Sequence, residues 1–95
     1  MYTISIGGAR TTKSGTEYVW VRMFDPFAEV LITNQYLMLA SAVYAWQDAW
    51  REEPRESKSE ATDEFRRRVR SAKKAGFILE TMSRAGRTLW KSGIE

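Results

Sequence analysis

The feature that most constrains the fold of this chain is one segment, residues 57–76, that carries both a start and a stop signal for an α-helix. Residues 57–60 (Ser-Lys-Ser-Glu) fit a capping box, in which a hydroxyl and a carboxylate satisfy the free amides at a helix start. Gly76 is a typical C-terminal stop. The residues between them place an apolar stripe at helical spacing, made of Ala61, Phe65, Val69 and Ala72. We therefore predict a helix over residues 58–75.

A second helix is predicted over about residues 34–53, capped by Thr33 or Asn34 and stopped by Pro54. Its apolar positions follow the i, i+4, i+7, i+11 pattern, with Leu39, Val43, Trp46 and Trp50 on one face, widened by Tyr36, Ala40 and Tyr44. The first three turns are apolar almost all round. This is more apolar surface than one small sheet needs to cover, so either the domain buries both sides or a partner covers one.

The first third of the chain has the pattern of β-strands. Residues 2–6 alternate apolar residues with threonine and serine, and residues 17–24 are rich in β-branched and aromatic residues. The polar residues 7–15, with glycines at both ends, connect the two segments. We interpret these segments as a hairpin with a long loop. The apolar run 27–33 is too short to assign by periodicity, and we favour a third strand over the opening of a helix.

The C-terminal segment indicates strand, turn and strand over residues 77–91, although Leu79, Met82, Ala85 and Leu89 also keep the spacing of a continued helix. From Phe65 to Lys91 the chain resembles the recognition helix and wing of winged-helix DNA-binding proteins. This resemblance covers less than a third of the chain, and it departs from the family where the charged linker 52–59 stands in place of a short second helix.

These elements predict an α+β fold in a single domain, residues 1–95. It would contain an N-terminal antiparallel β-hairpin or three-stranded meander, two α-helices and a possible C-terminal β-hairpin.

The residue types argue against an enzyme. The chain has no histidine, the commonest general acid–base group, and no cysteine for a nucleophile, a disulfide or a thiolate metal site. We expect no cofactor and no metal. Residues 8–14 are superficially similar to a phosphate-binding loop, but Thr12 stands where that motif requires glycine before the lysine. We expect a hairpin loop there, in which Arg10 and Lys13 are available to phosphate or to an acidic partner.

The sequence shows no signal peptide and no apolar run of about 18 residues, so we expect a cytoplasmic protein with no membrane contact. The net charge of +3 hides an asymmetry, because residues 66–95 hold nine basic and two acidic residues, against six and ten in the remainder. The basic positions predicted to bind nucleic acid or an acidic partner are Arg66, Arg67, Arg70, Lys73, Lys74, Arg84, Arg87 and Lys91, with Trp90 as a stacking plane.

Three functional hypotheses follow. The first is a small non-enzymatic protein that binds nucleic acid or a nucleoprotein complex through the basic helix face, with an affinity that falls steeply with salt. The second is an inhibitor or adaptor of the kind carried by phages and mobile elements, which binds a protein partner or forms a homodimer. Its interface would be the aromatic helix residues Tyr36, Tyr44, Trp46 and Trp50. A third is a structural protein of a virion or ribosome.

Overall fold

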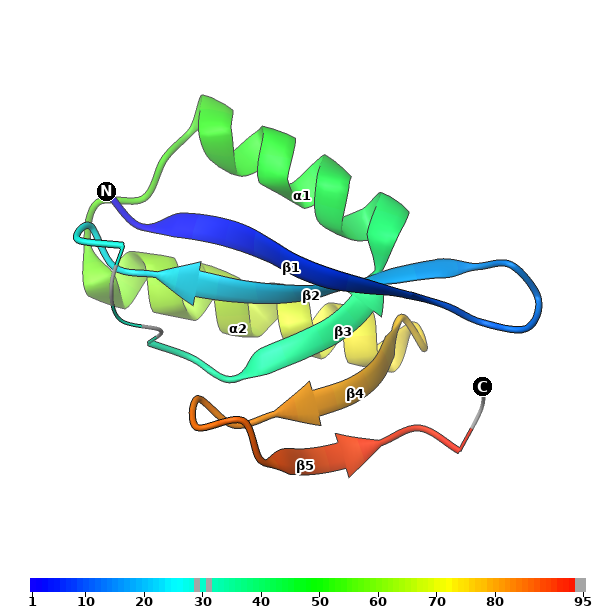
Figure 1. Cartoon of the computed structure of the whole chain (residues 1–95). Helices are drawn as coiled ribbons and strands as arrows, with labels where there is room; N and C mark the ends of the chain where they lie inside the picture. The colour runs from blue at the N-terminus through cyan, green and yellow to red at the C-terminus, as the bar shows by residue number, and fades with distance from the viewer. Residues whose placement is uncertain (29, 31, 94–95) are drawn as a thin grey trace.

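The computed structural model describes residues 1–28, 30 and 32–93, which form a five-stranded antiparallel sheet and two helices (Figure 1). The elements in chain order are β1 (Thr3–Thr11), β2 (Glu17–Phe24), β3 (Gln35–Leu39), α1 (Ala40–Glu52), α2 (Lys58–Lys74), β4 (Ile78–Met82) and β5 (Thr88–Lys91). The strands lie in the sheet in their order along the chain, and both helices are inserted between β3 and β4. The predicted α+β class, the N-terminal meander and the C-terminal hairpin are confirmed.

Both helices pack on one face of the sheet and share a single apolar core with it. On β2 the core residues are Val19, Val21 and Met23, which alternate with residues facing the other way. Phe65 of α2 lies at the centre of this core, with its ring centroid 5.0 Å from that of Trp46 on α1 and 6.0 Å from that of Tyr36 on β3. The opposite face of the sheet is called the open face below.

The helix α2 forms as the sequence predicts, because its signals are local. The Ser57 hydroxyl accepts a hydrogen bond from the backbone amide of Glu60 at 3.4 Å. Gly76 has a φ of +78°, a left-handed conformation that favours glycine and ends the helix. The predicted stripe is buried at all four positions: Ala61, Phe65, Val69 and Ala72.

The boundary between the third strand and the first helix differs from the prediction. The third strand is Gln35–Leu39 rather than residues 27–33, two of which, Glu29 and Leu31, lie outside the described residues. Helix α1 accordingly begins at Ala40, not near residue 34, and it has no side-chain cap. Leu37 and Met38 explain this difference: they face opposite sides of the sheet and both are buried, so burial on two faces decides for a strand.

The first connection is also shorter than predicted. Strand β1 continues through Gly7 and Gly8 to Thr11, because a β-bulge between Ile6 and Ala9 accommodates the two glycines within the ladder. The loop that joins β1 to β2 is therefore residues 12–16, and Arg10 belongs to a strand.

Candidate nucleic-acid interface

The cations predicted on α2 are all exposed, but they divide into two groups, with Lys74 on the side of Arg67 because seven residues make about two helical turns. Arg67 and the adjacent Arg68 form ion pairs with the buried carboxylate of Glu64, at 3.3 and 3.7 Å. These pairs lie on one side of the helix and reduce the charge available there. On the other side Arg66, Arg70 and Lys73 follow the i, i+4, i+7 spacing and so form one line along the helix. We call these three residues the basic ridge.

The basic ridge ends beside an exposed aromatic ring. The ammonium of Lys73 lies 4.8 Å from the centre of the Trp90 ring on β5, a cation–π contact between the end of α2 and the edge of the sheet. Trp90 is 38% exposed, although a large apolar residue such as tryptophan is usually mostly buried. The basic ridge therefore meets Trp90 at Lys73 and runs away from it along α2 through Arg70 and Arg66.

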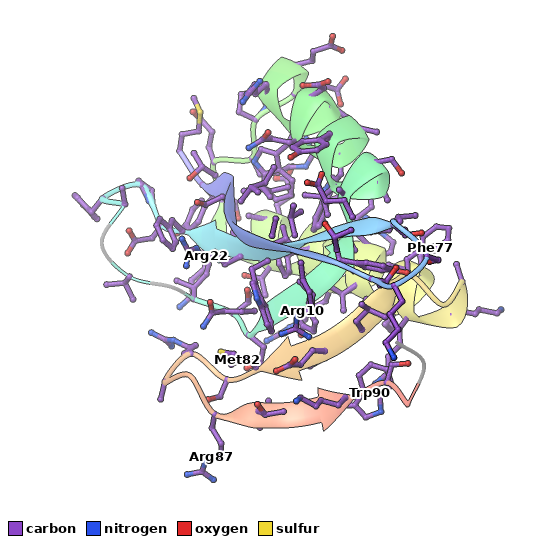
Figure 2. All side chains as sticks on the ribbon, turned by 45° about the vertical axis from the view of Figure 1, so that its right-hand side comes forward. Arg10, Arg22, Phe77, Met82, Arg87 and Trp90 are labelled. Carbon is purple, nitrogen blue, oxygen red and sulfur yellow. The ribbon has the colours of Figure 1, made fainter. Side chains whose placement is uncertain are left out.

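A pocket of about 420 Å³ opens at this end of the sheet, between the β1–β2 loop, the end of α2 and the ends of β4 and β5. Figure 2 shows Trp90 on the same side of the molecule as Phe77, and residues of the β1–β2 loop line the pocket together with Trp90. We call this the Trp90 pocket. Its wall combines an aromatic plane, a cation and several hydroxyls, supplied by Trp90, Lys73, Tyr18, Thr12, Ser14 and Thr16.

The three remaining predicted cations are exposed on the β4–β5 hairpin but do not converge on the pocket. Arg84 and Arg87 lie at the turn, and Figure 2 shows Arg87 at the other end of β5 from Trp90. Lys91 is paired with Glu80, whereas Trp90 is paired with Thr81, so the two neighbours on β5 face opposite sides of the sheet. The structure therefore brings Lys73 and Trp90 together and leaves Arg84, Arg87 and Lys91 apart from them.

The predicted aromatic interface is not a surface. Trp46 and Trp50 are only 4% and 5% exposed, and both belong to the core between α1 and the sheet. The indole nitrogen of Trp50 donates a hydrogen bond to the carbonyl of Tyr2 at 2.9 Å. Tyr36 lies on β3, half-buried, so that among the four proposed residues only Tyr44 is well exposed. The prediction was wrong for the two tryptophans because the helical stripe that carries them is the one that covers the sheet.

Arg10 has a structural role that the sequence does not reveal. Its guanidinium lies 3.2 Å from the carboxylate of Glu80, a residue that is 4% exposed on β4. The pair joins β1 to β4 across the two strands between them, and one of these strands carries Leu37, which is fully buried and has Trp20 and Glu80 as its cross-strand neighbours. Lys13, in contrast, is exposed in the hairpin loop.

The open face also carries residues that we did not predict as functional: Tyr18, Trp20, Arg22 and Phe24 of β2. They alternate with Val19, Val21 and Met23, and all four are half-buried. The guanidinium of Arg22 lies 5.4 Å from the Phe24 ring centre, and a side chain at Gly7 would approach it to 3.4 Å. The signal was present in the sequence, because the outer face of a half-covered strand is usually polar and here it is aromatic.

No protein-family model, no curated protein and no solved structure matches the chain. Within residues 1–28, 30 and 32–93, no helix is long and apolar enough to cross a membrane. The same residues hold no cluster of three or more acidic, histidine or cysteine side chains that would suit a metal ion.

Proposed function

We propose that this protein binds nucleic acid, or a nucleoprotein complex, through the basic ridge of α2, and that it does so without catalysis. The phosphate backbone supplies a line of negative charges, and the ridge supplies a line of exposed cations on a rigid helix. The observation that carries the proposal is the contact of Lys73 with Trp90, which joins this line of charge to an exposed aromatic ring.

The charge around the ridge supports this reading. From Arg66 to Leu79 the sequence contains no acidic residue, whereas solvated helix faces usually mix both signs. The first turn of α2 is acidic and its last turn is basic, so the helix dipole accounts for part of the pattern. It does not account for Arg66 and Arg70, which lie in the middle turns.

A charge-reversal variant tests the proposal. In Arg66→Glu with Arg70→Glu, two exposed cations of the basic ridge are inverted, while the Lys73–Trp90 contact is kept. We expect binding of labelled DNA and RNA at about 50 mM salt to weaken by at least tenfold and the slope of log K against log salt to fall by about two. Fluorescence anisotropy at about 50 and 200 mM salt measures both quantities.

The matched control is Arg51→Glu with Lys58→Glu, which makes the same change in net charge at the opposite end of the helices. It should leave most of the affinity intact if the ridge is the binding surface. Equal losses in the two double variants would indicate a nonspecific effect of net charge. An absence of binding at about 50 mM salt in the unmodified protein would overturn the proposal.

A second candidate, binding of a protein partner, is favoured by a different observation. A groove of about 180 Å³ lies where α1 and α2 meet, with the exposed ring of Phe77 at its wall beside Ala42, Trp46 and Ala75. A partner seated there would form a complex that depends little on salt, and Phe77→Ser would weaken it. This hypothesis keeps α1 as part of an interface, through Ala42 and Trp46, which line the groove.

A further inference from the structure

We infer that the Trp90 pocket takes one unpaired nucleobase, so that the nucleic acid bound by this protein is single-stranded. This inference rests on the proposed function and names the ligand more closely. It concerns a cavity that lies at the end of the basic ridge, where a strand whose phosphates follow α2 would next arrive.

The dimensions and the lining of the pocket fit a base. Its volume of about 420 Å³ falls within the range of small-molecule sites, which begins at about 300 Å³. Trp90 offers an aromatic plane on which any base can stack. The hydroxyls of Thr12, Ser14 and Thr16 form a chain of contacts at 2.9 and 3.4 Å along the loop. Because a hydroxyl both donates and accepts, this rim can bind base edges of either kind.

Lys73 links the pocket to the backbone. In the structure its ammonium lies against the Trp90 ring, at 4.8 Å from the centre. When a nucleotide enters, the ammonium moves to the phosphate and the base takes its place on the ring, so that neither group loses its partner. Lys73, the last residue of the ridge, thus exchanges its contact with the aromatic ring for a charge-assisted contact with a phosphate.

The pocket excludes a duplex for a simple reason. A paired base has its hydrogen-bonding edge occupied and both faces stacked, so entry would require unpairing and unstacking at a cost that a single strand does not bear. An unpaired strand presents the free base directly. A preference for single strands is therefore the property that separates this inference from simple attraction of phosphates to the ridge.

The test compares labelled oligo(dT) and oligo(U) of about 12 nucleotides with a duplex of equal length, by anisotropy at about 50 mM salt. We expect the single strands to bind at least tenfold more tightly than the duplex. Trp90→Leu, which keeps an apolar side chain but removes the aromatic plane, should lose about tenfold in single-strand affinity and little in duplex affinity. Trp90→Phe should retain most of the affinity.

Leu89→Ala is the matched control, because Leu89 is an exposed apolar neighbour on the same strand that does not line the pocket. Thermal melting of each variant verifies the fold. The inference is overturned if Trp90→Leu weakens single-strand binding no more than Leu89→Ala, or if the duplex binds as tightly as the single strands. In either case a loss of binding in Arg66→Glu with Arg70→Glu would leave the proposed function standing. Failure of every probe to bind would instead reject both.

Discussion

At the scale of single residues, the structure uses Glu80 to connect the two edges of the sheet. Its carboxylate accepts a hydrogen bond from Arg10 of β1 at 3.2 Å and another from Thr88 of β5 at 3.3 Å. A buried carboxylate is costly unless such bonds satisfy it, and those from a charged donor are the stronger kind. Arg10, which we predicted to be available to phosphate, therefore forms an ion pair within the protein. Lys13 in the β1–β2 loop is exposed.

Tyr36 provides a prediction at this scale. Burial raises the pKa of its hydroxyl above the ordinary value near 10, against smaller lowering effects of the Asn34 hydrogen bond and the Arg66 charge. In the interval between the unfolded and the folded pKa, the folded protein retains a proton that the unfolded chain releases. Stability should therefore fall as the pH rises above about 10. Urea denaturation from pH 8 upward should show this decline.

The matched variant Tyr36→Phe cannot ionise at this position and should flatten the decline. Ultraviolet absorbance of tyrosinate provides a second readout, because Tyr36→Phe should remove a tyrosine that ionises above the ordinary pKa near 10. An identical pH dependence in the variant and the unmodified protein would contradict the assignment to Tyr36.

At the scale of elements, the N-terminus of α2 depends on a single side chain. Ser57→Ala removes the hydroxyl that accepts the Glu60 amide, and we expect a loss of about 1 kcal/mol in the free energy of unfolding. Ser59→Ala is the control, because Ser59 is an exposed residue inside the same helix. A loss in Ser59→Ala as large as that in Ser57→Ala would contradict the capping role. Chemical denaturation measures both.

The same element shows what the sequence can predict. Helix α2 is bracketed by signals that act within one turn, so its bounds and buried stripe followed from the residues alone. The segment 35–40 could not be assigned in this way. Tyr36, Ala40 and Val43 keep helical spacing, and the strand exists because β2 and β4, distant in the sequence, pair on either side of it. The apparent excess of apolar residues in the first helix has the same cause, since its first part is a strand.

The candidate site also has one part that local sequence predicts and one part that depends on contacts between distant segments. The basic face was predictable, because helical spacing alone determines which cations of α2 are exposed. The Trp90 pocket was not, because it forms only when the hairpin loop, the end of α2 and the edge strand meet. The burial of Trp46 and Trp50 was likewise undecided in the sequence, where a stripe of aromatics fits both a core and an interface.

At the scale of the whole molecule, Phe65 joins both helices to the sheet. Its ring contacts Trp46 on α1 and Tyr36 on β3, and it is fully buried. We expect Phe65→Ala to cost about 3–5 kcal/mol, a large part of the 5–15 kcal/mol that stabilises a typical domain. Leu89→Ala, at an exposed position, should cost less than about 1 kcal/mol.

Far-ultraviolet circular dichroism and tryptophan fluorescence should report the Phe65→Ala loss with coincident transitions, because Phe65 of α2 packs against both α1 and β3. Separate transitions for the two signals would show that the helices and the sheet unfold independently.

The position of the helices between β3 and β4 also determines the order in which the chain can assemble. The pairs β1–β2, β2–β3 and β4–β5 join strands that are consecutive in sequence, but β3–β4 must close over residues 40–77. Closing so long a loop costs more chain entropy than the other pairings, unless docked helices have already shortened it. Until that happens, β3 and β4 each present an unpaired edge. A nascent chain is therefore most exposed to pairing with another copy of itself in the interval between helix formation and the joining of the two halves of the sheet.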